Sequence, residues 1–296
     1  MTDDASADDR EIDAAERRRV VRERYSDIAA NGPSASCCGD GGDGVGTAGS
    51  TACCGDTTPE PTPEPTPEPT NPDEESRRIG YDEDDVDAVA SGANLGLGCG
   101  NPTAIAGLEA GETVLDLGSG GGFDCFLAAR EVGDDGRVIG VDMTPEMVER
   151  ARENVERNDA DTVEFRLGEI EHLPVADGSV DAIISNCVIN LSPRKPQVFR
   201  EAYRVLRPGG RLAVSDVVQT APFPPDVRLD PSSVAGCVAG ASTIAAVESM
   251  LADAGFEDIA VDPQDESEEF IRDWDADRDV SEYVVSATIE ARKPGS

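Results

Sequence analysis

Short apolar runs and helical patterns alternate through most of the chain after residue 112. The helical pattern that ends at Asn158 begins with Thr144-Pro145-Glu146, so threonine is expected as the N-cap and proline at the first helical position. Alternating strands and helices predict a mostly parallel sheet with helices on both faces. The first four predicted strands, which are short and rich in valine, isoleucine and leucine, cover 113–117, 138–142, 163–167 and 180–185.

The second half of the chain supplies the remaining strands. A helix at 196–206 and a turn at 207–210 lead to a strand at 211–218. A helix at 243–254 follows, and further apolar runs predict strands at 259–261 and 283–291. The expected fold class is therefore α/β, with a seven-stranded Rossmann-like sheet and a flexible N-terminal extension.

A glycine-rich turn follows the first predicted strand and precedes an apolar helix at 123–132. The second strand then ends in Asp142, twenty-two residues after Gly120. This βαβ unit is typical of a site for an adenosine-bearing cofactor, because glycines allow close backbone approach and the carboxylate accepts the ribose hydroxyls.

The residues of this turn favour one class of cofactor. Phe123 occupies the place where a dinucleotide fold needs a third small residue, and Asp116 would repel a pyrophosphate. A cationic cofactor without phosphates suits the turn better, and its D-x-G-x-G pattern resembles motif I of the class I S-adenosylmethionine-dependent methyltransferases. A nicotinamide or flavin site and a turn without ligand remain the alternatives. The expected cofactor-binding residues are Asp116, Gly118, Ser119, Gly120, Asp142, Met143, Glu169, Ile170 and Asn186.

The charge of the chain excludes two classes of partner. With 61 acidic and 25 basic residues, the formal net charge is −36, which repels nucleic acid and anionic membrane surfaces. Only Lys195 and Lys293 among the basic residues are lysines, and such acidic, lysine-poor chains resemble cytosolic proteins of extreme halophiles. The start of the chain lacks a basic segment followed by an apolar one, so we expect a soluble, cytoplasmic protein.

We expect three parts in the chain. Residues 1–57 contain a helix at 11–30 and two cysteine pairs, residues 58–75 form a linker rich in proline, threonine and glutamate, and residues 76–294 form the catalytic body. The cysteine pairs suit a mobile thiol arm; a zinc site and a dispensable tail are the alternatives. The pairs are Cys37-Cys38 and Cys53-Cys54.

Three further cysteines lie on predicted loops at the carboxyl edge of the sheet, where ligands of such folds bind. They are Cys99, Cys187 and Cys237, whereas Cys125 lies in an apolar helix and is expected to pack in the core. Thiolates prefer soft centres. A methyl acceptor held by such thiols points to a thiophilic element with a lone pair, and trivalent arsenic fits.

Six motifs in the body of the chain are N-L-G-L-G-C-G-N-P (94–102), L-D-L-G-S-G-G-G-F-D-C-F (115–126), G-V-D-M-T (140–144), E-I-E-H-L-P (169–174), S-N-C-V-I-N-L (185–191) and G-C-V-A-G-A (236–241). With these motifs the chain resembles the arsenite methyltransferases from Ser91 to about Pro294. The resemblance implies that Cys99, Cys187 and Cys237 bind arsenic. It also implies that the chain is an acidic, haloarchaeal-type member of this family. The two N-terminal cysteine pairs and the proline-rich spacer depart from the family pattern. It is therefore open which of these N-terminal cysteines corresponds to the family's remaining cysteine.

The chemistry implied is transfer of the methyl group of S-adenosylmethionine to arsenite or methylated trivalent arsenicals. Arsenic held by thiolates has no proton to lose, so no general base is expected. Methylation formally oxidises arsenic, and one N-terminal cysteine pair, recharged by a thioredoxin-like or small-thiol reductant, would return it to the trivalent state. The alternatives are methylation of another small molecule, such as a quinone precursor, and an arsenic- or thiol-sensing module without turnover.

Overall fold

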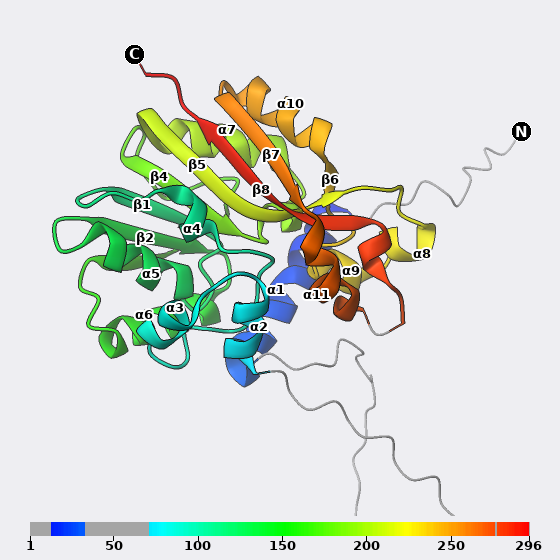
Figure 1. The fold of residues 1–296 in the computed structure, drawn as a ribbon, viewed down its shortest axis with the longest axis horizontal. Coiled ribbons are helices and arrows are strands. Elements are labelled where there is room, and N and C mark those ends of the chain that lie inside the picture. Colours follow the sequence, from blue (N-terminus) through cyan, green and yellow to red (C-terminus); the bar gives the residue numbers. More distant parts are fainter. Residues whose placement is uncertain (1–12, 33–70, 276, 296) are drawn as a thin grey trace, which may run out of the picture.

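A computed structural model gives the fold and describes residues 13–32, 71–275 and 277–295 (Figure 1). The two cysteine pairs and the repeats at 58–70 lie outside the described residues. The helices are α1 (Ala14–Asn31), α2 (Pro72–Arg78), α3 (Glu83–Ala88), α4 (Pro102–Ala106), α5 (Phe123–Val132), α6 (Pro145–Arg157), α7 (Lys195–Val205), α8 (Pro225–Arg228), α9 (Pro231–Ala235), α10 (Ile244–Ala254) and α11 (Glu268–Ile271), with 3₁₀ turns η2 (Ile189–Leu191), η3 (Asp265–Ser267), η4 (Arg272–Trp274) and η5 (Val280–Glu282).

The strands form one sheet in the order β3-β2-β1-β4-β5-β8-β7, and the two-residue β6 pairs with β5. The pairs from β3 to β5 are parallel, and β8 is antiparallel to both of its neighbours. The expected mostly parallel Rossmann-like sheet is therefore confirmed. The strands are β1 (Thr113–Leu117), β2 (Arg137–Asp142), β3 (Val163–Leu167), β4 (Val180–Asn186), β5 (Leu206–Gln219), β6 (Ser242–Thr243), β7 (Glu257–Gln264) and β8 (Val284–Arg292).

The strand β5 begins earlier than the sequence predicts. The expected turn at 207–210 is part of the strand, because a register shift between Val180 and Ala182 of β4 absorbs the extra residues as a bulge. Gly209 has a φ of 83° there, and its N–H donates to the carbonyl of Lys293. Proline and glycines are tolerated at such a bulge. The predicted turn at 207–210 thus corresponds to the bulge, and the strand begins at Leu206 and not at Arg211.

The two faces of the sheet are covered by different helices. Along β1, Val114 packs in one apolar cluster and Leu115 in the other, as alternation along a strand requires. The first cluster includes residues of α1, α5 and α6, and the second includes residues of α7 and α10. Both faces are thus covered, and the site has to lie at an edge of the sheet.

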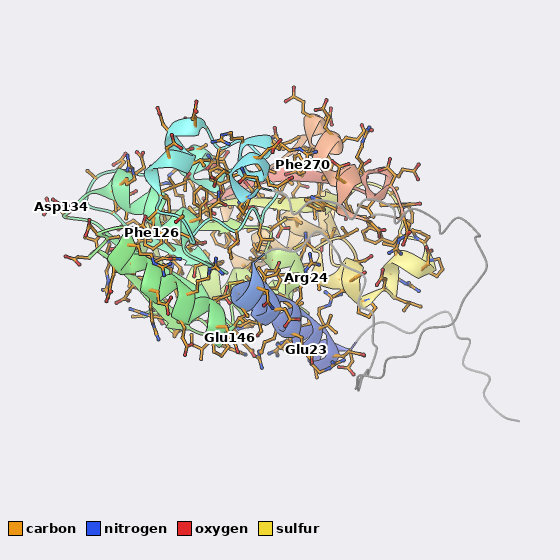
Figure 2. All side chains as sticks on the ribbon, turned by 90° about the horizontal axis from the view of Figure 1, so that it is seen from below. Glu23, Arg24, Phe126, Asp134, Glu146 and Phe270 are labelled. Atoms are coloured by element: carbon orange, nitrogen blue, oxygen red, sulfur yellow. The ribbon has the colours of Figure 1, made fainter. Side chains whose placement is uncertain are left out.

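The N-terminal helix α1 lies against the body, beside α6 and α9 (Figures 1 and 2). Its Val21 is 1% exposed, and its Ser26 hydroxyl donates to Glu146 of α6 at 3.0 Å. The expected division at residue 57 separates α1 from the body that it packs on. The expected linker end at residue 75 also moves, because α2 begins at Pro72 with Asn71 as its N-cap.

Candidate active site

The glycine turn between β1 and α5 forms one wall of the site. Gly118 and Gly120 have φ values of 72° and 49°, a region that favours glycine. A Cβ at Gly118 would lie 2.3 Å from a methyl carbon of Val188, so a side chain does not fit there. The sequence pattern of this turn therefore follows from both conformation and close approach.

Asp142 ends β2 beside this turn. One of its carboxylate oxygens accepts the N–H of Gly120 at 3.0 Å, and the other accepts the N–H of Thr144 at 2.8 Å. Burial raises the pKa of Asp142, and these backbone donors oppose the rise. Thr144 is the N-cap residue of α6, as predicted, but its side chain makes no capping hydrogen bond.

A pocket opens over this turn at the carboxyl ends of the strands. Its empty space, which includes open solvent at the mouth, is about 1050 Å³. Its walls come from α1, from the loop at 93–98, from the glycine turn and from the ends of β2 and β4. The pocket therefore joins the glycine turn to the end of β4, and Cys187 lies in its lining.

Three thiols gather at the Cys187 end of the pocket. Cys99, Cys187 and Cys237 are 2%, 7% and 4% exposed. The Cys237 thiol donates to the carbonyl oxygen of Cys187 at 2.7 Å. Burial raises the pKa of the Cys187 thiol well above its ordinary value, and the neighbouring thiols of Cys237 and Cys99 raise it further. The structure thus brings the three predicted cysteines to one place.

Two of these cysteines have strained backbones. Cys187 and Cys237 have φ values of 55° and 69°, which are uncommon for residues other than glycine. The N–H of Cys187 donates to the carbonyl of Ser215 at 2.8 Å, which anchors the turn after β4 to β5. Such strain persists only where surrounding contacts enforce it and often marks a functional site.

A carboxylate that the sequence interpretation missed joins the thiols. One ligand atom each of Cys99, Cys187 and Asp216 lies within 4.8 Å of the others. Burial raises the pKa of Asp216 to about 6, and N–H donors from Val217 and Asn190 limit the rise. The arrangement offers soft sulfur donors with one hard oxygen beside them.

Comparison with known proteins assigns the chain to a family. A family model described as "Methyltransferase domain" matches residues 108–255. The "Arsenite methyltransferase" of Halobacterium salinarum is 62% identical over 282 residues, which are 95% of this chain and 68% of that protein. The chain belongs to the arsenite methyltransferase family.

Two other similar proteins carry related names. The "Arsenite methyltransferase" of Aquipseudomonas alcaligenes is 46% identical over 153 residues, which are 49% of this chain and 43% of that protein. The crystal structure of an arsenic(III) S-adenosylmethionine methyltransferase from Chlamydomonas reinhardtii matches with a TM-score of 0.56 and 35% identity, over 76% of this chain and 74% of that one.

The pocket of this family member fits S-adenosylmethionine. The hydroxyl of Ser119 is buried and has no hydrogen-bond partner among the described residues. Gly120 has open space where a side chain would stand. Asp142 keeps lone pairs beyond those that accept the two amides, and the buried Asp116 lines the same pocket. These groups suit ribose hydroxyls and a cationic sulfonium.

The pocket contains most, but not all, of the predicted cofactor residues. Glu169 is not in its lining; this carboxylate lies 3.6 Å from Arg18 and 4.0 Å from Arg22 of α1. Glu171 lines the pocket instead, where it accepts from Arg18 at 3.1 Å and from Ser192 at 2.8 Å. The predicted residues in the lining are Asp116, Gly118, Ser119, Gly120, Asp142, Met143, Ile170 and Asn186.

Asn186 links the two ends of the site. Its side-chain oxygen accepts the N–H of Cys99 at 2.9 Å, and its amide nitrogen donates to the carbonyl of Gly100 at 2.7 Å and to the hydroxyl of Tyr81 at 3.0 Å. Asn186 therefore positions the loop that carries Cys99. Cys125 is buried, as expected, and its thiol also donates to Asp116 at 3.2 Å.

The sequence interpretation also missed the part of α1 in the pocket. Arg18, Val21 and Tyr25 line it, and burial raises the pKa of Tyr25 well above its ordinary value. The apolar spacing of Val21 and Tyr25 indicated a docking face without showing its partner. Asp216 had a clearer signal, because it is the one charged residue in the strand core Leu212-Ala-Val-Ser-Asp-Val-Val218. In the described part of the chain, no helix has the length and hydropathy needed to span a membrane.

Proposed function

We propose that this chain transfers the methyl group of S-adenosylmethionine to trivalent arsenic held by Cys99, Cys187 and Cys237. The observation that carries the proposal is the grouping of two further buried thiols around Cys187, which lines the pocket that contains Asp142 and the glycine turn. Membership of the arsenite methyltransferase family supports it.

The thiols bind the substrate by exchanging ligands with it. Each S–H gives its proton to a hydroxide of As(OH)₃, an As–S bond replaces an As–O bond, and water leaves. Sulfur is the preferred donor for this soft centre. Because the Cys237 thiol donates to the Cys187 carbonyl, it has to give up that hydrogen bond before it can bind arsenic.

S-adenosylmethionine supplies an electrophilic methyl group on a sulfonium. Asp142 would hold the ribose, Ser119 and Gly120 of the turn would contact the cofactor, and the carboxyl group of Asp116, which lines the same pocket, would suit its positive charge. The thiols aim the arsenic lone pair along the line of methyl transfer and leave no proton to remove. Alignment alone can be worth an effective molarity of about 10⁵ M or more.

A second pair of thiols restores the substrate. Formation of the As–C bond uses the arsenic lone pair, so arsenic changes formally from the trivalent to the pentavalent state. Two N-terminal thiols return two electrons, lose two protons and become a disulfide, which a thioredoxin-like or small-thiol reductant then reduces. The candidates are Cys37 with Cys38 and Cys53 with Cys54, which lie outside the described residues.

The test is the release of S-adenosylhomocysteine when arsenite is added to the protein with S-adenosylmethionine and a thiol. We expect release that depends on arsenite and gives methylated arsenic in equal amount. Arsenite binding without release would instead support a sensing module. Release with a quinone precursor but not with arsenite would support the methylation of another small molecule.

A further inference from the structure

The donor group around Cys99 differs from the set of three cysteines. Among the described residues, Cys99, Cys187 and Asp216 form a group in which one ligand atom of each lies within 4.8 Å of the other two, and Cys237 is not a member. All three donors are buried. Two soft sulfurs and one hard oxygen are not the donors expected for arsenic alone.

This donor set has the chemistry of a zinc site. Zinc prefers tetrahedral coordination by thiolate, imidazole and carboxylate, and open sites use three protein ligands with a water in the fourth position. Zn–S bonds of about 2.3 Å and Zn–O bonds of about 2.0–2.2 Å place neighbouring donors roughly 3.5–3.8 Å apart. In the structure the three ligand atoms lie within 4.8 Å of one another, and the side chains would have to close to this spacing around the ion. We propose that Cys99, Cys187 and Asp216 bind a divalent cation of borderline softness, zinc being the best match.

The surroundings hold the carboxylate in place for this role. One oxygen of Asp216 accepts from the Asn190 amide and from the N–H of Val217, both at 2.8 Å, and the other accepts the N–H of Asn190 at 3.2 Å. Such outer contacts orient metal ligands and affect affinity by about 10- to 100-fold. Cys187 lines the pocket, which gives the cation a way in, and the net charge of −36 attracts cations.

Asp216 distinguishes zinc binding from arsenic binding at this group of residues. Trivalent arsenic is pyramidal, and three sulfurs complete its bonds, so the carboxylate adds nothing to it. Zinc uses Asp216 and does not need Cys237. Zinc and arsenic share Cys99 and Cys187, so zinc should compete with arsenite; this consequence, unlike the zinc site, rests on the proposed function.

The experiment measures zinc affinity directly, by competition of the protein with a chromophoric chelator for ZnCl₂. The background is the full chain with serine in place of the four N-terminal cysteines, so that those thiols do not bind the metal. In this background Asp216→Asn and Cys99→Ser should each weaken zinc binding at least about tenfold. Cys237→Ser is the matched control and should leave zinc affinity unchanged. The replaced cysteines are Cys37, Cys38, Cys53 and Cys54.

X-ray absorption at the zinc edge counts the ligands without relying on a mutant that folds. Two sulfur and one or two oxygen ligands are expected, and three sulfurs would overturn the assignment. The proposal also fails if the background protein binds no zinc, if folded Asp216→Asn binds zinc like its parent, or if Cys237→Ser weakens binding as much as Cys99→Ser. None of these readouts requires methyl transfer, so they stand apart from the test of the proposed function.

Discussion

The cofactor half and the thiol half of the site are built in different ways. The cofactor half, Asp116 to Asp142, comes from one βαβ unit, and glycines take its positive φ values. The thiol half joins Cys99, Cys187, Asp216 and Cys237 from separate loops and strands, and two cysteines themselves take positive φ values. A local unit can be exchanged between proteins with its chemistry intact, whereas the thiol half depends on the whole sheet edge.

The variants with the largest expected effect disrupt the thiol half and leave the cofactor half intact. Cys187→Ser and Cys237→Ser should each abolish methylation of both arsenite and methylarsenite, because oxygen does not replace the soft ligand. Cys99→Ser should abolish only the methylation of arsenite, because arsenic that already carries one methyl group has two bonds left for thiolates. Turnover with each substrate checks this.

Cofactor affinity is the control for these variants. Calorimetry should show that all three variants bind S-adenosylmethionine like the parent chain. The hydrogen bonds that hold Asp142 come from the backbone N–H groups of Gly120 and Thr144 and involve none of the three thiols. Normal turnover of methylarsenite by Cys187→Ser would show that arsenic is held elsewhere.

The second effect breaks the cofactor half and spares the thiols. Asp142→Ala removes the ribose anchor and should weaken S-adenosylmethionine binding by about 2–4 kcal/mol, roughly 30- to 1000-fold. Arsenite binding, measured as the loss of free thiols when arsenite is added, should stay unchanged. Equal cofactor affinity in the variant and the parent chain would remove Asp142 from the site.

The different origins of the two halves explain what the sequence could predict. The βαβ unit has a local signature, so the bounds of β1 and α5 and the position of Asp142 at the end of β2 follow from apolar runs and glycines. The thiols were predicted to meet because each follows a strand or lies on a loop at the same edge. The sequence interpretation assigned Glu169 to the cofactor, whereas Glu171 lines the pocket, because the positions of both side chains depend on how α1 packs on that loop.

The position of α1 was the least predictable feature. Its sequence shows an apolar face, but the partner of that face is formed by α6, α9 and the turn η2, which are far along the chain. The place of Asp216 beside the thiols could not be predicted for the same reason. It depends on the pairing of β5 with the end of β4, which brings Asp216 close to Cys187.

A third, smaller effect tests whether α1 belongs to the cofactor half. Arg18→Ala removes the ion pair with the buried Glu171 and the one with Glu169, and should weaken S-adenosylmethionine binding by about 1–2 kcal/mol, roughly 5- to 30-fold. Arg19→Ala is the matched control, because the ion pairs of Arg19 with described residues are those with Glu16 and Glu23 inside α1. Similar losses in the two variants would mean that α1 acts through its helicity and not through this contact.

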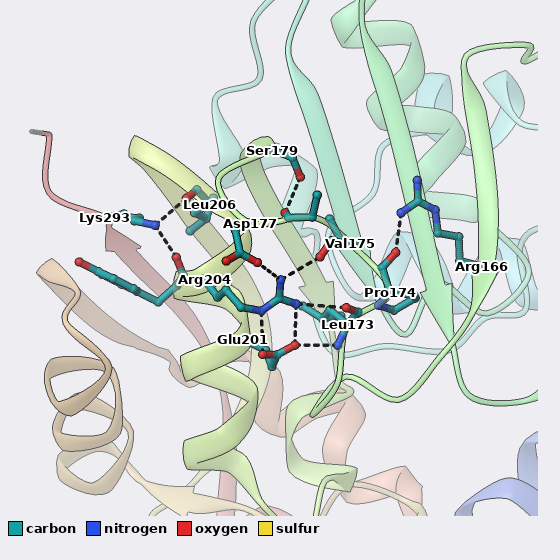
Figure 3. A network of polar contacts seen from close by, with 12 residues as sticks. Arg166, Leu173, Pro174, Val175, Asp177, Ser179, Glu201, Arg204, Leu206 and Lys293 are labelled. Atoms are coloured by element: carbon teal, nitrogen blue, oxygen red, sulfur yellow. Dashed lines mark hydrogen bonds and ion pairs between the residues drawn. The ribbon is translucent and has the colours of Figure 1, made fainter.

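The smallest effect concerns the support beneath the cofactor half. Arg204 of α7 donates to the carbonyls of Leu173 and Val175 and forms ion pairs with Glu201 and Asp177, which fixes the loop that follows Glu171 (Figure 3). The Asp177 side chain is 79% exposed, so solvent screens its pair, whereas that of Glu201 is 13% exposed.

Asp177→Ala should therefore lower the free energy of unfolding by only about 0.2–1 kcal/mol, and less as salt is added. Glu201→Ala is the matched contrast and should cost about 1.5–3 kcal/mol, because Glu201 also accepts the N–H of Leu173 at 2.8 Å. Chemical denaturation at two salt concentrations measures both losses. Cofactor affinity should follow the same order, since the loop leads from the pocket to β4. An Asp177→Ala loss as large as that of Glu201→Ala would show that the exposed pair, and not the half-buried one, holds the loop in place.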